Sequence, residues 1–193
     1  MGCCVCGCFL LRNVCAAYRI SQGAVYFLQR NHHSFNTWSM RKYRIVIHCS
    51  ATAADSDYSE QHLERDHLVR KINSPGGYHF YIRKDGTIIK MRDLDKQGAH
   101  ALPYNHDSHG ICYEGGLKAG GKDWRDAQDT RTEPQKASIL KCIYASILHF
   151  IEEESGKVNI DYEFEIIGHG QLPAVKKECP SFDAKSEYAW ITA

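Results

Sequence analysis

The stretch with the clearest chemical potential is GHGQLPAVKKECPSFD, residues 168–183. It places the imidazole of His169 and the thiol of Cys179 ten positions apart in one proline-containing loop. A short apolar run over residues 164–167 precedes the loop and is typical of a strand that ends at His169. The two side chains can bind one metal ion if a third ligand comes from elsewhere in the chain.

His48 is the natural candidate for the third ligand. It follows the β-branched run YRIVI, residues 43–47, which predicts a central strand buried on both faces. Two histidines and one cysteine suit zinc and leave its fourth tetrahedral position to water, as in catalytic sites, whereas a structural site would normally close that position. No HExxH motif is present, which excludes a helical protease-type site. We therefore expect one Zn²⁺ per chain, bound by His48, His169 and Cys179.

Composition limits the possible partners. The chain has 193 residues, enough for one ordinary domain, and 24 basic against 23 acidic residues give a formal charge of +1. This balance provides no overall field that would attract nucleic acid or an anionic membrane, so we expect neither as a partner. Five of the nine cysteines precede Met40, and the other four lack the spacing of a disulfide framework. A reducing compartment is expected.

Residues 1–39 differ in composition from the rest, because all 23 acidic residues lie beyond them. We expect a non-globular extension over 1–39 and a catalytic domain over 40–193, with translation beginning naturally at Met40 or the extension dispensable. No basic residue precedes the apolar run CVCGCFLL and no convincing cleavage site follows, so the sequence does not predict a signal peptide. The start MGCCVC approaches an acylation signal, but Cys6 stands where Ser or Thr is required. Synthesis in the cytoplasm is expected.

The pattern from Met40 onward predicts an α/β fold. In chain order it indicates the strand over residues 43–47, a polar helix over 59–72, a β-hairpin over 78–91 with a tight Asp-Gly turn, a strand over 111–114, a long amphipathic helix from Pro134 to just before Gly156, the strand over 164–167 and a short helix over 182–190. We expect a single domain with a mixed central β-sheet of about five strands and helices on both faces.

The hairpin places two candidate groups next to each other. Because side chains alternate along a strand, Tyr78 and Phe80 are expected on one face and His79 and Tyr81 on the other. Only one of Tyr78 and His79 can then face the site.

Three histidines, His100, His106 and His109, crowd the approach to the strand over residues 111–114. Each could ligate a metal in isolation, or they could be loop residues that line a polar cleft. Cys142 and His149 are expected to belong to the packing pattern of the amphipathic helix.

Four motifs in the order IHCSAT, GGYHFYIRKDG, GAHALPYNHDSHGIC and KECPSFD carry a family resemblance. Together they resemble the zinc-dependent N-acetylmuramoyl-L-alanine amidases of the phage-lysozyme type, which share their fold with the peptidoglycan recognition proteins. The resemblance covers about residue 40 to the C-terminus. It implies endolysin-like hydrolysis of the amide bond between N-acetylmuramic acid and L-alanine in peptidoglycan, by a monomer that acts on the cell wall.

The resemblance also assigns roles to residues. It implies that zinc is bound by the same three side chains proposed above, that Tyr78 and Lys177 assist the chemistry, and that His100 lines the substrate cleft. The loop between the late histidine and cysteine is longer than expected, which leaves Lys176 open as an alternative to Lys177.

Three other interpretations stay open at this point. A recognition module would keep the cleft and lose a metal ligand, most simply Cys179. A cysteine hydrolase that uses Cys179 with His169 would be inhibited by thiol reagents and need no metal. A structural zinc site would hold a metal that supports no hydrolysis.

Overall fold

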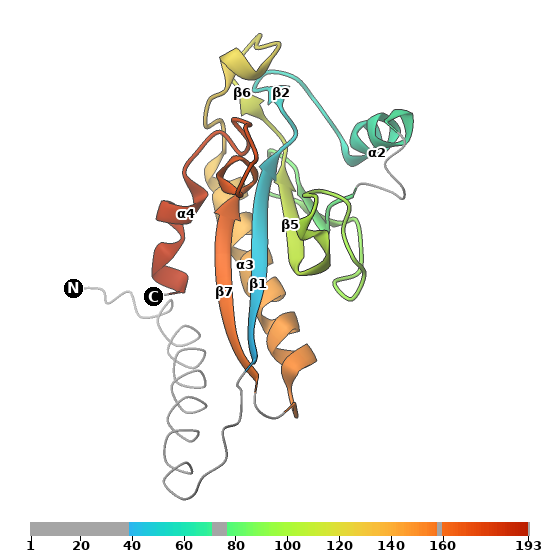
Figure 1. The fold of residues 1–193 in the computed structure, drawn as a ribbon. Helices are drawn as coiled ribbons and strands as arrows, with labels where there is room; N and C mark the ends of the chain where they lie inside the picture. The colour runs from blue at the N-terminus through green and yellow to red at the C-terminus, as the bar shows by residue number, and fades with distance from the viewer. Residues whose placement is uncertain (1–38, 71–76, 158–159, 193) are drawn as a thin grey trace, which may run out of the picture. The chain divides into compact units, whose positions relative to one another are not determined.

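The computed structural model describes residues 39–70, 77–157 and 160–192. Residues 1–38 of the expected extension, and the end of the expected helix over 59–72, lie outside this part. A five-stranded sheet forms its centre, in the order β4-β3-β5-β1-β7. Figure 1 shows β7, β1 and β5 side by side in this sheet. The strands are β1 (Ser39–Cys49), β3 (Phe80–Ile82), β4 (Ile88–Lys90), β5 (Ser108–Tyr113) and β7 (Ile160–Gly168).

The sheet is mixed. β1 runs parallel to both of its neighbours, β5 and β7, while β3 pairs parallel with β5 and antiparallel with β4. Three consecutive residues of β1, Ile45, Val46 and Ile47, have no exposed surface, as expected of a strand covered on both faces. The predicted α/β fold with about five strands is confirmed.

The β3–β4 hairpin forms around the predicted Asp-Gly turn, where Gly86 adopts a φ of +86° and the Asp85 carboxylate accepts a hydrogen bond of 2.8 Å from the N–H of Thr87.

The predicted alternation of side chains between Tyr78 and Tyr81, before the turn, is wrong. Phe80 packs in the main hydrophobic core on one face of the sheet. Tyr78 packs on the opposite face, against the cluster that contains Tyr81. Residues 77–79 bend before β3 begins, and Gly77 has a φ of +65°, so strand alternation does not extend back to Tyr78.

One face of the sheet is covered by the long helix α3 (Glu133–Glu154). Thr132 and Gln135 form a capping box at its start, and Pro134 occupies its first turn, as the sequence predicts. Its buried side chains, among them Cys142 and Ile143, pack against the sheet residues Ile45, Ile47, Ile111 and Tyr113. The packing role expected of Cys142 is confirmed.

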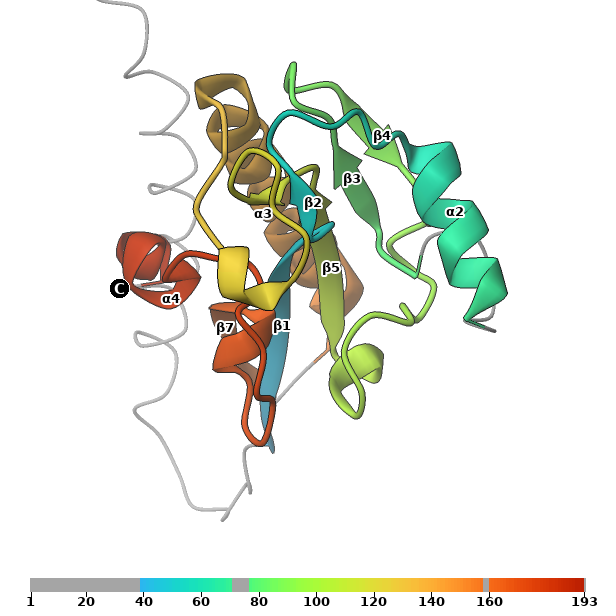
Figure 2. The ribbon, with the colours of Figure 1, turned by 90° about the horizontal axis from the view of Figure 1, so that it is seen from above.

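The other face carries the helix α2 (Glu60–Val69), whose Leu63 packs on Tyr81 and Cys112. Figure 2 shows α2 and α3 on opposite sides of the sheet, so the prediction of helices on both faces is confirmed. Because Ile45 and Ile47 face α3, alternation along β1 places His48 on the face that α2 partly covers.

Shorter elements complete the described part. The predicted helix over residues 182–190 is divided into α4 (Ala184–Glu187) and a 3₁₀ turn (Ala189–Ile191). Two short strands, β2 (Thr52–Ala53) and β6 (Gly116–Leu117), pair parallel beyond the ends of β1 and β5. Further 3₁₀ turns cover Tyr104–His106, Trp124–Asp126 and His169–Gln171. Among the described helices, none has the length and apolar character needed to cross a membrane.

Candidate metal centre

The structure brings His48, His169 and Cys179 together. One ligand atom from each lies within 4.8 Å of the others. The Nδ1 of His48 is 3.8 Å from the Sγ of Cys179, and the rings of His48 and His169 have centroids 4.5 Å apart. A nitrogen and a sulfur that bind one tetrahedral zinc are about 3.6 Å apart, given the usual bond lengths. The three side chains are therefore spaced to hold a single ion.

The parallel pairing of β1 and β7 explains how two of these residues meet. Ile47 of β1 pairs with Gly168, the last residue of β7. The next residues of the two segments, His48 and His169, therefore lie at the same edge of the sheet. The carboxyl ends of adjacent parallel strands are where such side chains converge. His48 is buried, whereas His169 and Cys179 are half-buried.

The late loop folds back to bring Cys179 to this edge. The carbonyl of Cys179 accepts a hydrogen bond of 2.6 Å from the N–H of Gly170, and the N–H of Cys49 lies 3.4 Å from the Sγ of Cys179. Gly170 is required for this approach, because a Cβ there would lie 1.9 Å from the carbonyl oxygen of Lys177. A backbone N–H directed at the sulfur favours its thiolate form.

The protonation of the three groups differs. Burial lowers the pKa of His169 to about 4 and also lowers that of His48, so both imidazoles are neutral at pH 7. The hydrogen bond that Cys179 shares with the thiol of Cys49, together with burial, raises the pKa of Cys179 well above its ordinary value. The same hydrogen bond lowers the pKa of Cys49 to about 7.

Tyr78 lies beside the cluster. Its ring centroid is 4.9 Å from that of His48, and burial raises the pKa of its hydroxyl well above the ordinary value, with the thiol of Cys112 adding to the effect. His79 points elsewhere, since its Nε2 lies 2.9 Å from the carbonyl of Lys96. Of the two adjacent candidates, Tyr78 is the one at the centre.

Lys177 is exposed on the late loop, and its positive charge adds to burial in lowering the pKa of both His48 and His169. The neighbouring Lys176 is not among the groups that shift the pKa of either histidine. The charge of Lys177 therefore acts on the centre.

The three histidines before and within β5 have separate surroundings. The Nδ1 of His100 lies 3.1 Å from the Nε2 of His48. His106 is exposed, and His109 is stacked on Phe150 of α3 with ring centroids 4.0 Å apart. Only His100 of the three joins the centre. Nothing in the sequence spacing indicated its contact with His48, because that contact depends on how the loop before β5 packs across the sheet.

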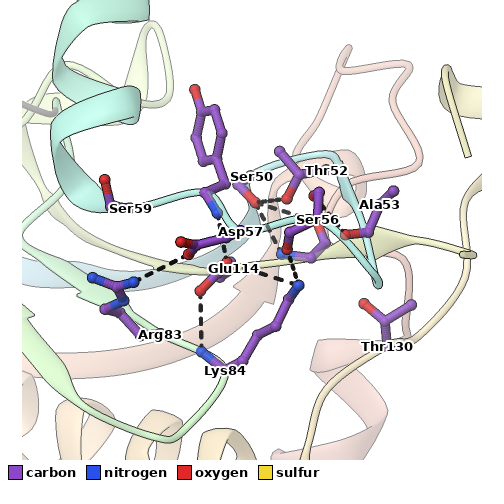
Figure 3. A network of polar contacts seen from close by, with 12 residues as sticks. Ser50, Thr52, Ala53, Ser56, Asp57, Ser59, Arg83, Lys84, Glu114 and Thr130 are labelled. Carbon is purple, nitrogen blue, oxygen red and sulfur yellow. Dashed lines mark hydrogen bonds and ion pairs between the residues drawn. The ribbon is translucent and has the colours of Figure 1, made fainter. Parts of the chain in front are cut away.

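A buried carboxylate fixes the segment that follows His48. Glu114, just past β5, accepts hydrogen bonds from the N–H groups of Tyr58 at 2.8 Å and Lys84 at 3.2 Å, and its side chain is 2% exposed (Figure 3). The Nζ of Lys84 lies 3.8 Å from the same carboxylate. Glu114 thereby ties the loop that leaves β1 to the hairpin turn.

We expect Glu114→Ala to lower the free energy of unfolding by about 3 kcal/mol, because two backbone donors lose a charged acceptor in a buried place. Urea denaturation of the full chain measures this. Asp57→Ala is the matched control, since Asp57 pairs with Arg83 at an exposed position and such pairs contribute about 0–1 kcal/mol. Equal losses in the two variants would contradict the role of Glu114.

Comparison with known proteins agrees with this geometry. A family model described as N-acetylmuramoyl-L-alanine amidase matches residues 39–182. The endolysin of Enterobacteria phage K11 is 34% identical over 140 residues, which cover 72% of this chain and 81% of that endolysin. The matched residues run from the start of β1 to beyond Cys179, so they include all three side chains of the cluster.

Solved structures give the same picture. The N-acetylmuramoyl-L-alanine amidase LysC from Clostridium intestinale is 26% identical, with a TM-score of 0.52, over 83% of this chain and 94% of its own. A variant of the Drosophila recognition protein PGRP-LB, solved in complex with tracheal cytotoxin, is 25% identical, with a TM-score of 0.54, over 76% of this chain and 79% of its own. The fold is thus similar to that of both hydrolytic and recognition proteins.

Proposed function

We propose that this chain, which belongs to the N-acetylmuramoyl-L-alanine amidase family, uses a single zinc ion held by His48, His169 and Cys179. The chain is a peptidoglycan amidase: it hydrolyses the amide bond between N-acetylmuramic acid and L-alanine. The observation that carries the zinc proposal is the convergence of three ligand atoms within 4.8 Å. Two imidazoles and one thiolate fit a catalytic zinc, since they leave one tetrahedral position for water.

When bound, zinc supplies an acidified water, with a pKa of about 7, as the nucleophile for the amide carbonyl. The chain's own groups handle the remaining charge and protons. The ammonium of Lys177 stabilises the negative charge that develops on the carbonyl oxygen, and one such donor typically contributes about 3 kcal/mol to the rate. Tyr78 stays a neutral hydroxyl because burial raises its pKa, so it can donate a hydrogen bond to the same oxygen or a proton to the leaving amine.

The complete ligand set favours catalysis over recognition alone. A module that only binds peptidoglycan has no need of Cys179 beside His48, whereas a hydrolase needs the third ligand. Metal analysis tests the proposal: we expect one zinc per purified chain. A chain that hydrolyses peptidoglycan without bound metal and is inactivated by thiol reagents would instead support a cysteine hydrolase.

Zinc affinity is expected to rise about tenfold for each pH unit between pH 5 and 7. The reason is that Cys179 and Cys49 are both thiols in this range, while His48 and His169 are already neutral, so binding releases one proton. Competition with a zinc chelator at each pH measures this.

The matched variant for this pH series is Cys179→Asp, whose carboxylate is ionised over the same range. We expect its zinc affinity to change little between pH 5 and 7. A flat profile in the unaltered chain, or the same slope in both proteins, would show that the proton does not come from Cys179.

At the level of the whole chain, we propose that residues 40–193 suffice for folding and catalysis, and that the protein is made in the cytoplasm and acts on the cell wall as a monomer. The start of the family match at residue 39 supports a boundary at this point of the chain. A chain that begins at Met40 should match the full chain in specific activity and sediment as a single copy. Loss of activity in that shorter chain would contradict the boundary.

A further inference from the structure

Both ring nitrogens of His48 have a partner. Nδ1 faces the Sγ of Cys179 at 3.8 Å, and Nε2 faces the Nδ1 of His100 at 3.1 Å. The rings of His48 and His100 are nearly perpendicular, at 88°. A neutral imidazole carries one proton, so a histidine that binds metal through Nδ1 has its proton on Nε2. That N–H needs an acceptor, and the Nδ1 of His100 is in place to accept it.

The ring of His100 is held in this position by its surroundings. It lies in a slot lined by two glycines: a Cβ at Gly98 would come within 2.5 Å of the His100 ring, and a Cβ at Gly110 within 2.6 Å. The side-chain oxygen of Asn105, itself buried, accepts hydrogen bonds from the N–H groups of His100 at 2.8 Å and Ala101 at 2.7 Å. Backbone and ring are therefore both fixed, as expected for a group that orients another.

We infer that His100 is a positioning residue, whose Nδ1 accepts the Nε2–H of His48 and so fixes the tautomer and ring orientation that present the Nδ1 of His48 to the metal. The inference rests on the proposed zinc site. It makes His100 a partner of the metal ligand His48 instead of a residue that contacts the substrate. Partners of this kind on metal-bound histidines typically account for about 10–100-fold in metal affinity. Gly98 and Gly110 are needed for this arrangement, because only residues without a Cβ leave room for the ring of His100.

Zinc affinity measured by chelator competition, with no substrate present, tests this directly. We expect His100→Phe to bind zinc about 10–100-fold more weakly, because phenylalanine fills the slot and offers no acceptor. His100→Asn should remain close to the unaltered chain, since its amide oxygen can occupy the place of Nδ1. Gly110→Ala keeps His100, but the added Cβ displaces the His100 ring, so this variant should also bind zinc more weakly. His106→Phe, at an exposed position of the same segment, should have no effect.

Equal zinc affinity in His100→Phe and the unaltered chain would overturn the inference, as would His100→Asn that binds as weakly as His100→Phe. A raised KM with unchanged zinc affinity would show a substrate contact instead, and would leave the zinc site intact. If the unaltered chain bound no zinc, the proposed function would fail together with this inference. Thermal unfolding of the metal-free proteins checks folding; if His100→Phe does not fold, the comparison of His100→Asn with Gly110→Ala decides the question.

Discussion

Cys179→Ala is expected to remove both stoichiometric zinc and amide hydrolysis. Cys179 supplies the only sulfur among the three clustered ligand atoms, and the N–H of Cys49 is directed at it. Structural zinc sites with four ligands bind with about 10–16 kcal/mol, or about 3 kcal/mol per ligand, so the loss of one ligand lowers affinity by about two orders of magnitude or more. His48→Ala should have the same effect, since it removes a ligand of the same site.

Metal analysis after dialysis, together with release of stem peptide from cell walls, measures both losses. Cys142→Ala is the matched control: it removes a buried thiol that packs in α3, away from the cluster, and should keep zinc and activity. Full zinc occupancy in Cys179→Ala or His48→Ala would mean that the ligands are assigned incorrectly.

Lys177→Ala and Tyr78→Phe are expected to act differently, with zinc retained, the fold intact and turnover reduced by about a hundredfold or more. Neither residue supplies a ligand atom to the cluster, yet the charge of Lys177 reaches both histidines and the ring of Tyr78 lies 4.9 Å from that of His48. Their effect should therefore appear in turnover, while zinc content stays at one per chain.

Lys176→Ala is the natural control, because it removes the same charge one position earlier in the loop. We expect it to leave turnover nearly unchanged. A large loss in Lys176→Ala with little change in Lys177→Ala would show that the neighbouring lysine acts in catalysis.

Local signals explain why much of the fold could be predicted. The Asp-Gly turn determines the β3–β4 hairpin, and the cap at Thr132 with Pro134 marks the start of α3. Each of these two signals lies within a few adjacent residues. The buried run before His48 predicted a central strand, and parallel pairing with β7 then brought His48 to His169.

Features that depend on packing between distant segments were not predictable in the same way. Tyr78 faces the centre because the chain bends at residues 77–79, which strand alternation does not foresee. The contact of His100 with His48 depends on a slot formed by Gly98 and Gly110, and these glycines stand in different segments. The sequence could name His100 as a candidate through family resemblance, but not the atom that it meets.

The most direct test of a zinc-dependent amidase is release of stem peptide from purified peptidoglycan sacculi by the full chain, before and after removal of metal. We predict that the chain as purified, with one zinc per molecule, releases peptides that begin with a free L-alanine amine. Dialysis against a chelator should abolish the release, and one equivalent of zinc should restore it. Undiminished release by a chain shown to be free of metal would contradict the account.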